Sequence, residues 1–412
     1  MTTNSKKIRQ IKRLVLVDPY TSGHHISYVR IYSAALLELG CEVVILTPET
    51  RLLENYLADF LANSGDKLRV CPLFRRKVSA FETSNALKQG RLNNLWKSLF
   101  SWLDFRDIAN SIRLNQLERP SLIFILWLDS YITRYLPAFA VDALMPAPFA
   151  GLYFHPAHLK RDAVTGNLYR DLLFYLPLFK SRKLKFVAGF DDRLLTQLAR
   201  TYQGVEFVTL PDIAEKHQPD LGHEMIREIL NRARGRKIIA LLGSLDRRKN
   251  VLEFFEAARH CCDDDLFFVC VGTLHAARFP AEQLEAMRDI LAQHPDRLYF
   301  HNGFVASDQV FDALFEFSSA VFAVYRDFPA SSNMIVKSAL YSKPVIVADE
   351  HLMGEMVREF RLGVTVGDAR PQTLLRAIRE VVSPPASGEY GFDRFIKTFS
   401  FETLKASLER LL

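Results

Sequence analysis

The sequence contains little that would build a disulfide-rich, zinc-binding or membrane-spanning protein. It has five cysteines among 412 residues, and no two of them form a Cys-x-x-Cys pair, so neither a disulfide framework nor a common zinc site is indicated. Its longest apolar tract, Leu122 to Phe154, is interrupted by charged residues, which argues against a transmembrane helix. The basic N-terminus is followed only by the short run LVLV, which predicts a buried strand and not a signal-peptide core. These absences predict a cytoplasmic protein.

Two widespread phosphate-binding signatures are also missing. The chain contains neither GxGxxG nor GxxxxGK, so dinucleotide-dependent oxidoreductases and P-loop enzymes lose their main sequence support. The formal charge is only +6, with 24% charged residues. This mild basicity is compatible with anionic small molecules or anionic lipid headgroups, and it does not indicate a nucleic-acid partner.

What the sequence does contain is a regular alternation of short apolar runs with longer amphipathic segments. Runs such as KIIALL, LFFVCV and PVIVA are apolar on both faces, as in parallel strands that are covered by helices on both sides. The pattern predicts an α/β protein with two doubly wound, Rossmann-like domains. The predicted strands are Leu14–Asp18, Glu42–Thr47, Leu68–Cys71, Leu122–Trp127, Ala150–His155, Lys185–Gly189, Val205–Leu210, Lys237–Leu242, Leu266–Val271, Arg297–Phe300, Ser319–Tyr325, Pro344–Ala348 and Gly363–Val366.

The two predicted domains are separated by a polar stretch that contains prolines and glycines, as domain boundaries often do. We expect a first domain over residues 1–212, a linker over 213–235 and a second domain over 236–390. We expect the last residues, 391–412, to form a helix that packs back toward the first domain.

A basic and aromatic region, residues 75–113, has two possible roles. It begins with Arg75, Arg76 and Lys77 and continues into a helical pattern that interleaves Leu, Trp and Phe with Lys and Arg. Such a pattern is compatible with peripheral contact to an anionic membrane surface. It is also compatible with a helix that covers the first sheet, and the acidic residues Asp104 and Asp107 favour this second role.

In the first half of the chain, polar residues follow several predicted strands. Gly23, His24 and His25 follow the first strand, Asp129 follows the fourth and His155 ends the fifth. Ligands of doubly wound domains bind at the carboxyl ends of their strands, so we predict His24, Asp129 and His155 as catalytic candidates. Gly23 permits a tight turn at this edge. Structural roles compete with each prediction, because a histidine can pack or hydrogen-bond and Asp129 can cap a helix.

In the second half, two stretches are suited to phosphate. The segment KIIALLGSLDRRKN joins a buried strand to a Gly-Ser turn and then to Arg247, Arg248 and Lys249; the turn allows close backbone approach and the cations supply charge. The step Ser331-Ser332-Asn333 opens a helical run, and the free N–H groups of a helix start can hold an anion.

With these residues in place, the chain resembles the GT-B glycosyltransferases over nearly its whole length. The opening DPYTSGHHISYVRIYSAALLELGCEVVILTPE is similar to their first strand and loop. In the second half, LLGSLDRRKNVLEFFEAAR and SALYSKPVIVADEHLMGEMVREFRLGVTV resemble segments of the retaining family 4, or group 1, transferases. The resemblance implies two Rossmann-like domains that face each other across a cleft.

The resemblance also implies roles for individual residues. Lys249, with Arg248 or Arg247, would clamp the donor diphosphate, and the amides of Ser331, Ser332 and Asn333 would hold its distal phosphate. His155 would touch the transferred sugar, and Gly23 would lie against donor or acceptor. These groups neutralise the phosphate charge, so no metal ion is expected.

Three positions depart from the family pattern. Aligning Lys343-Pro344-Val345-Ile346 with the family's KPVI places Pro329 and Lys337 where relatives carry two glutamates. Ser244, which we also predict to contact the donor, replaces an arginine of the family. A lysine cannot accept hydrogen bonds from ribose hydroxyls. Lys337 is therefore expected either to contact an anionic group of a substrate or to face solvent, and in the latter case Lys337→Glu would strengthen nucleotide-sugar binding.

The resemblance implies a glycosyltransferase that moves a sugar from a nucleotide-sugar to a glycan, lipid or small-molecule acceptor. It implies retention of configuration, with no metal and no cofactor beyond the nucleotide-sugar itself. Two alternatives remain: a non-catalytic binding or scaffolding protein, which the missing glutamates favour, and a sugar-nucleotide epimerase. The sequence does not identify the sugar, the nucleotide base, the acceptor or the oligomeric state.

Overall fold

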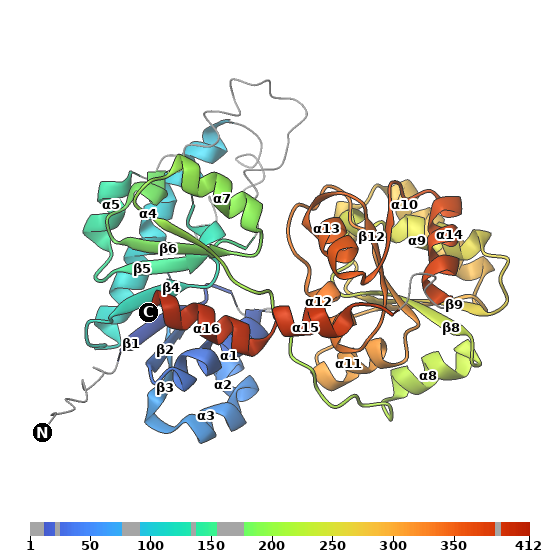
Figure 1. Cartoon of the computed structure of the whole chain (residues 1–412), viewed down its shortest axis with the longest axis horizontal. Helices are drawn as coiled ribbons and strands as arrows, with labels where there is room; N and C mark the ends of the chain where they lie inside the picture. Colours follow the sequence, from blue (N-terminus) through green and yellow to red (C-terminus); the bar gives the residue numbers. More distant parts are fainter. Residues whose placement is uncertain (1–11, 21–24, 76–90, 133–136, 155–176, 384–388) are drawn as a thin grey trace, which may run out of the picture. The chain divides into compact units, whose positions relative to one another are not determined.

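The computed structural model describes residues 12–20, 25–75, 91–132, 137–154, 177–383 and 389–412. The chain divides into two compact units (Figure 1). The first unit comprises residues 1–211 and 401–412, and the second comprises residues 212–400. Each unit is built on one parallel sheet with helices on both faces, which confirms the predicted α/β class with two doubly wound, Rossmann-like sheets.

The first unit contains a seven-stranded sheet with the order β3-β2-β1-β4-β5-β6-β7. Adjacent strands in it run parallel, and the direction of winding reverses between β1 and β4. Such a reversal opens a crevice at the carboxyl ends of the two strands, where ligands of this architecture bind. The strands are β1 (Arg13–Val17), β2 (Glu42–Thr47), β3 (Leu68–Pro72), β4 (Leu122–Ile125), β5 (Phe149–Leu152), β6 (Leu184–Gly189) and β7 (Glu206–Thr209).

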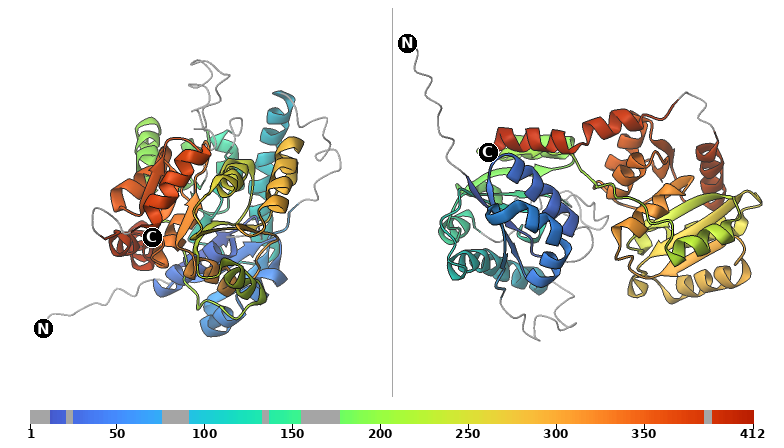
Figure 2. Two further views of the ribbon diagram at one scale, coloured as in Figure 1. Left: turned by 90° about the vertical axis from the view of Figure 1, so that its right-hand side faces the viewer. Right: turned by 90° about the horizontal axis from the view of Figure 1, so that it is seen from below.

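Helices of the first unit pack on this sheet through apolar faces. The described part of α4 buries Phe105, Ile108 and Ile112 in the core. The final helix α16 (Phe401–Leu411) runs alongside α1, and Lys405 Nζ lies 2.7 Å from Glu38 Oε2 (Figure 2). The other helices are α1 (His25–Glu38), α2 (Thr50–Tyr56), α3 (Ala58–Ser64), α4 (Arg91–Leu114), α5 (Ala138–Leu144) and α7 (Asp192–Thr201).

The second unit contains a six-stranded sheet with the order β10-β9-β8-β11-β12-β13, which reverses between β8 and β11. Its strands are β8 (Lys237–Leu242), β9 (Leu266–Gly272), β10 (Leu298–Asn302), β11 (Ala320–Ala323), β12 (Val345–Ala348) and β13 (Gly363–Val366). The helices α9 (Val251–His260), α10 (Ala281–Gln293) and α14 (Pro371–Val382) cover one face. The other face is covered by α8 (Glu224–Ala233), α11 (Asp308–Glu316), α12 (Asn333–Leu340), α13 (His351–Phe360) and α15 (Phe392–Thr398).

The segment that we expected to be a linker, residues 213–235, instead contributes to the second unit. It contains α8, whose residues Met225, Ile226 and Ile229 are buried in the core. These apolar residues lie on one side of a helix whose other side is charged, so the polar composition of the segment reflects a solvated helix face. The last residues also divide between the units, because α15 packs on α12 and α13 while α16 packs on α1.

A glycine at the end of β9 allows the ends of β8 and β9 to approach closely. Gly272 has φ +157°, and a Cβ atom at this position would lie 1.7 Å from the carbonyl oxygen of Gly243. That contact is with backbone, which cannot move aside as a flexible side chain can. We expect Gly272→Ala to destabilise the second unit by at least about 3 kcal/mol, measured as a lower thermal unfolding midpoint.

Gly367→Ala provides the matched control for this prediction. Gly367 also follows a strand of the same sheet, its φ is not in the left-handed region, and a Cβ there would meet no atom within 4 Å. The control should unfold within about 0.5 kcal/mol of the wild type. Equal midpoints for the two variants would contradict the steric explanation.

Candidate functional site

The loop after β8 lies at the winding reversal of the second unit and carries most of the predicted phosphate-binding cations. Gly243 adopts φ +91°, which lets the chain turn sharply out of the strand. Asp246 then caps a short 3₁₀ helix, Arg247–Lys249, by accepting a hydrogen bond from the amide of Arg248. The carboxylate of Asp246 also accepts from Arg278 at 3.1 Å. The loop is therefore held in one conformation by its own capping residue.

Lys249 and Arg248 project from this loop toward the residues that follow β11. The Lys249 side chain is only 5% exposed; its Nζ donates to the carbonyl oxygen of Leu242 at 2.7 Å and lies 5.2 Å from the centre of the Tyr325 ring. The Arg248 guanidinium lies 4.4 Å from the Phe328 ring centre. Among the described residues, its Nε has no hydrogen-bond acceptor, and the Asp246 carboxylate lies 3.6 Å away. Each cation thus lies beside an aromatic ring, which attracts positive charge without neutralising it, and beside one oxygen acceptor, the carbonyl of Leu242 for Lys249 and the carboxylate of Asp246 for Arg248.

Ser244, the third predicted donor residue of this loop, contacts a histidine that we did not predict. Its Oγ lies 2.7 Å from Nε2 of His275, in the turn that follows β9. The two turns are tied together by a bridge between Leu245 and Leu274. His275 follows a strand at the ligand-binding edge, and this position was the one signal in the sequence that could have identified it.

The start of α12 is the predicted phosphate cradle, and its side chains are all engaged within the protein. Ser332 caps the helix by accepting from the amide of Met334. The Ser331 hydroxyl donates to the Asp212 carboxylate at 2.7 Å, and the Asn333 amide group donates to the carbonyl oxygen of Ile213. Within the first turn, the amides of Met334 and Ile335 donate to the hydroxyl and to the carbonyl oxygen of Ser332. A phosphate would therefore have to contact the other backbone N–H groups of this helix start, and not the side chains.

Lys337 has a role that the sequence did not reveal. It is 8% exposed and forms an ion pair with the fully buried Asp312 of α11. Asp312 also accepts hydrogen bonds from the Tyr341 hydroxyl at 2.9 Å and from the amide of His217 at 2.8 Å. The expectation that Lys337 faces solvent was wrong. Its ammonium pairs with an internal carboxylate and also lies 5.9 Å from the centre of the Phe311 ring, which belongs to the same helix as Asp312.

Electrostatics keep Asp312 ionised in this cluster. Burial by itself would raise the pKa of the carboxyl group, but the hydrogen bond from His217 and the charge of Lys337 outweigh burial and lower it. Burial, together with the hydrogen bond to the same carboxylate, raises the pKa of Tyr341. The pair is therefore a charged, fully partnered network, and removing either charge leaves the other buried.

In the first unit, a second polar cluster lies at the winding reversal between β1 and β4. Asp18 directly follows β1 and is 1% exposed; its Oδ1 lies 3.4 Å from His25 Nδ1 and accepts from the amide of Tyr20. The His25 ring packs on Trp127, which follows β4, with 4.0 Å between ring centres. The Tyr20 hydroxyl lies 2.7 Å from Ser130 Oγ. Burial raises the pKa of the Asp18 carboxyl group.

Of the three catalytic candidates in the first unit, Asp129 lies among the described residues. Asp129 lies in a short 3₁₀ helix after β4, and its Oδ2 accepts from the amide of Phe154 at 2.7 Å. This contact fixes the chain after β5 and gives Asp129 a structural partner. His24 and His155, and also Gly23, lie outside the described residues, so their predicted roles stay predictions.

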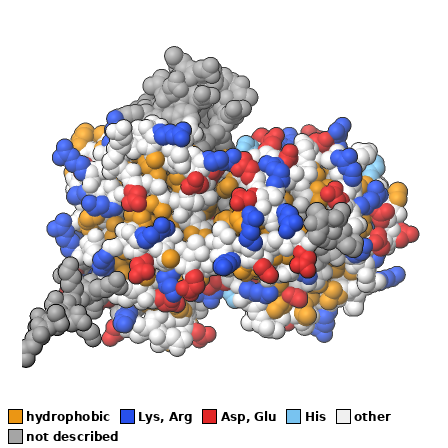
Figure 3. All heavy atoms as spheres, viewed as in Figure 1, with side chains coloured by type: hydrophobic (Ala, Val, Ile, Leu, Met, Phe, Trp, Pro, Cys, Tyr) orange, Lys and Arg blue, Asp and Glu red, His pale blue; other side chains and the backbone are white. Residues whose placement is uncertain are grey.

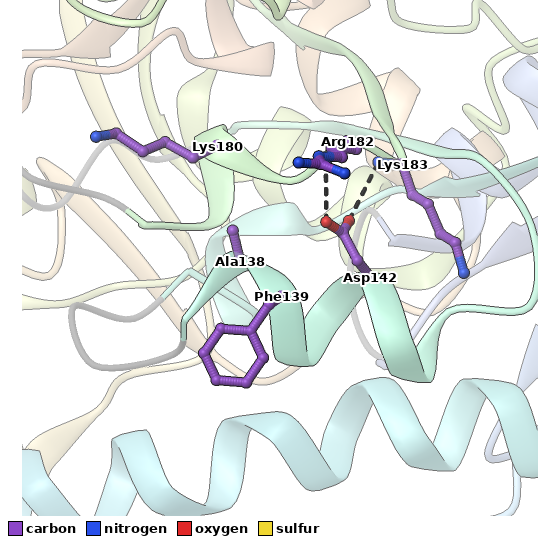
Figure 4. A pocket seen from close by; sticks show the side chains of 6 residues that line it. All are labelled: Ala138, Phe139, Asp142, Lys180, Arg182 and Lys183. Carbon is purple, nitrogen blue, oxygen red and sulfur yellow. Dashed lines mark hydrogen bonds between the residues drawn. The ribbon is translucent and has the colours of Figure 1, made fainter.

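A shallow pocket on the first unit lies away from these clusters. It is lined by Ala138, Phe139, Asp142, Lys180, Arg182 and Lys183 (Figure 4). Arg182 and Lys183 directly precede β6, so the pocket lies at the amino ends of the parallel strands, whereas Asp18 and Trp127 lie beyond carboxyl ends. Asp142 accepts hydrogen bonds from the amides of Arg182 and Lys183. The pocket is thus held by structural contacts and does not coincide with the predicted site.

The predicted membrane contact through residues 75–113 is only partly described. The second half of α4 packs into the core through Phe105 and Ile108, as expected of a helix that covers the sheet. None of the helices in the described ranges has the length and apolarity needed to span a bilayer. On the face shown in Figure 3, acidic and basic side chains of the described residues are interspersed. Peripheral membrane contact stays a prediction.

Comparisons with known proteins address the fold. No protein-family model matches the chain, and no curated protein matches its sequence. Among solved structures, sucrose-phosphate synthase from Thermosynechococcus elongatus matches with TM-score 0.65 and 15% identity, over 97% of this chain and 98% of that one. Anabaena HepE in complex with UDP and glucose matches with TM-score 0.63 and 13% identity, over 97% and 98%. Trehalose 6-phosphate synthase from Burkholderia multivorans matches with TM-score 0.68 and 12% identity, over 98% of both chains. This chain has the GT-B glycosyltransferase fold of these proteins along nearly its whole length, and identities this low show the fold alone.

Proposed function

We propose that this protein is a glycosyltransferase that moves a sugar from a nucleotide-sugar to a hydroxyl acceptor. The observation that carries the proposal is the pair of cations, Arg248 and Lys249, at the winding reversal of a sheet with the GT-B fold. Two of the solved structures that share this fold contain UDP with glucose or UDP-2-fluoro glucose. A diphosphate is the part of such donors that a pair of cations would recognise.

The donor diphosphate would bind between the β8 loop and the start of α12. Lys249 can keep its hydrogen bond to Leu242 and still donate to a phosphate oxygen, because an ammonium group has three N–H donors. Arg248 would supply further N–H groups, and the helix N-terminus would supply backbone N–H groups and a partial positive charge. Ser244 lies on the β8 loop itself and is paired with His275 on the adjacent turn after β9; both would contact the donor from that side. With this charge compensation, we propose transfer without a metal ion.

The stereochemical course that we propose is retention. The acceptor oxygen would bond to the anomeric carbon on the face from which the diphosphate departs. The departing phosphate keeps the electron pair of the broken C–O bond and takes the proton of the acceptor hydroxyl. This course requires no strong base on the protein, so the replacement of the two family glutamates by Pro329 and Lys337 is compatible with activity.

A non-catalytic protein with the same fold is the second candidate. The observation that favours it is the internal use of Lys337, Ser331 and Asn333, whose side chains bind Asp312, Asp212 and the carbonyl of Ile213. A protein that does not turn over substrate could tolerate this loss of side chains from the donor site. However, a protein that binds no diphosphate does not require two cations beside aromatic rings at the strand ends, and this pair of cations therefore favours the glycosyltransferase.

Nucleotide binding and product stereochemistry test the proposed function. We expect isothermal titration to show binding of UDP, GDP or ADP, and we expect the matching nucleotide-sugar to yield a product with the donor's anomeric configuration by NMR. EDTA should leave the rate unchanged. Absence of binding by all three nucleotides would favour the non-catalytic candidate, and an inverted product would overturn the retaining course.

A further inference from the structure

Two loops of the second unit meet beside the predicted phosphate cations, and two polar side chains join them. The β8 loop, residues 243–250, runs from β8 to α9 and carries Arg248 and Lys249. The β11 loop, residues 324–332, runs from β11 to α12. The last residue of the β8 loop, Asn250, is only 3% exposed, and its side chain meets Arg326 of the β11 loop. Neither of these two side chains contacts the donor in the function proposed above.

The Asn250 side chain bonds to the β11 loop through both of its polar atoms. Its Nδ2 donates to the carbonyl oxygen of Val324 at 3.0 Å, and its Oδ1 accepts from Arg326 Nη2 at 2.9 Å. The same guanidinium nitrogen also donates to Glu253 Oε1 of α9 at 2.8 Å, which holds the arginine in place. A carbonyl only accepts and a guanidinium only donates, so these partners define one orientation of the Asn250 amide group.

The backbones of the two loops adopt specific conformations at the same place. Asn250 has φ +52° and Asp327 has φ +48°, both in the left-handed region, which asparagine and aspartate adopt more readily than most residues do. The backbone amide of Arg326 donates to the carbonyl oxygen of Arg248 at 2.8 Å. Asn250 thus completes the β8 loop through its backbone and connects it to the β11 loop through its side chain.

These bonds determine where the guanidinium of Arg248 lies. It stands 4.4 Å from the ring centre of Phe328 and 5.5 Å from that of Tyr325, and both rings belong to the β11 loop. The ammonium of Lys249, by contrast, donates to the carbonyl oxygen of Leu242 in the strand before its own loop. The position of Arg248 therefore depends on the bonds between the loops, and that of Lys249 depends on them less.

We propose that Asn250 and Arg326 are positioning residues that hold Arg248 in place to bind the diphosphate of a nucleotide-sugar. They act through Arg248 and need not touch the ligand. A side chain that is already held loses less conformational freedom on binding, so a fixed guanidinium binds phosphate more tightly than a mobile one. The inference rests on the proposed function, since it concerns the same diphosphate site, and all of its residues belong to the second unit.

Two variants and one control test the positioning role. Asn250→Gly removes the side-chain bonds without changing charge, and glycine adopts the left-handed conformation without strain. Arg326→Met removes the other half of the contact. Its control is Arg259→Met, since Arg259 also pairs with a glutamate of α9, Glu256, at 2.8 Å, and its side chain is 42% exposed against 45% for Arg326. Arg259 lies at the end of α9 that leads to the amino end of β9, away from the two loops.

We expect Asn250→Gly to weaken binding of UDP, GDP or ADP, whichever the wild-type protein binds, about 10-fold by isothermal titration. Arg326→Met should weaken it at least about three-fold, and Arg259→Met should stay within about two-fold of the wild type. Hydrogen exchange by mass spectrometry should be faster in the peptide around Arg326 in both variants. Thermal unfolding verifies that each protein is folded at the temperature of the titration.

A double-mutant cycle with Arg248→Met separates positioning from a general structural role. If Asn250 acts through Arg248, adding Asn250→Gly to Arg248→Met should change the nucleotide Kd by less than about two-fold. A general effect of the glycine on the fold would instead weaken binding by the same factor with and without Arg248.

The outcomes distinguish this inference from the proposed function. Wild-type nucleotide Kd values in both Asn250→Gly and Arg326→Met would overturn the positioning role and leave the proposed function intact. An equal loss of binding in both backgrounds of the cycle would also overturn it. If the wild-type protein bound none of the three nucleotides, the proposed function would fail, and the positioning role with it.

Discussion

Replacing Lys337 by glutamate is expected to destabilise the second unit by about 3–5 kcal/mol. The substitution removes the cation that pairs with the buried Asp312 and places a second carboxylate beside it. Asp312 would keep its hydrogen bonds from His217 and Tyr341, but these cannot offset a like charge at close range. From the structure we therefore expect Lys337→Glu to lower stability, and not to strengthen nucleotide-sugar binding as the sequence suggested.

Thermal unfolding followed by circular dichroism, together with hydrogen exchange by mass spectrometry, would measure the effect. Because the chain has two units, a single unfolding free energy is not well defined. Faster hydrogen exchange in α11 and α12 would show that stability is lost around the ion pair. Lys185→Glu is a suitable control, since Lys185 is exposed on β6 of the first unit. That variant should differ from the wild type by no more than about 0.5 kcal/mol.

A double-mutant cycle identifies the cause. Lys337→Met leaves the Asp312 carboxylate buried without its cation, and the added substitution Asp312→Asn removes that charge as well. The double variant should recover part of the stability lost by Lys337→Met. Additive losses would show that the ion pair contributes nothing, and a Lys337→Glu protein that binds nucleotide more tightly without loss of stability would contradict this interpretation.

The strands were the most predictable part of the fold. Parallel strands that are buried on both faces have continuous apolar sequences. Each of the thirteen predicted strands overlaps a strand in the part of the chain that the structure describes. The errors lie at strand ends. The predicted strands at Leu122–Trp127 and Ser319–Tyr325 end later than the observed strands. The apolar residues Trp127 and Tyr325 lie in the buried turns that follow these strands, so the apolar pattern does not mark the strand end.

Side-chain partners from distant segments were not predictable. The pattern around Lys337 identified an unusual position, but its partner Asp312 lies 25 residues away on another helix, and no sequence spacing indicates that contact. The same holds for His275, which reaches Ser244 across two turns. Local features were predictable, such as Asp191, which caps α7 by accepting from the amides of Arg193 and Leu194.

Lys249→Met is expected to lower turnover about 100- to 1,000-fold, the range that follows from removing one preformed donor to a developing negative charge. Methionine keeps most of the apolar stem that packs beside Tyr325 but removes the charge. The carbonyl oxygen of Leu242 also loses its hydrogen-bond donor, which can reduce stability by about 1–3 kcal/mol. Both kcat/KM and the nucleotide Kd should therefore be measured, with thermal unfolding alongside.

The control for Lys249→Met lies at the other end of the same strand. Lys237 begins β8, is exposed and pairs with Asp265 at 3.4 Å. Lys237→Met removes the same charge from the same strand, but at the amino edge, so turnover should be unchanged. If Lys249→Met lowered only stability and left nucleotide binding intact, Lys249 would be a structural partner of Leu242, as Lys337 is of Asp312. If a stably folded Lys249→Met protein instead lost nucleotide binding, the charge of Lys249 would be shown to bind a ligand, whereas the charge of Lys337 pairs with Asp312 inside the protein.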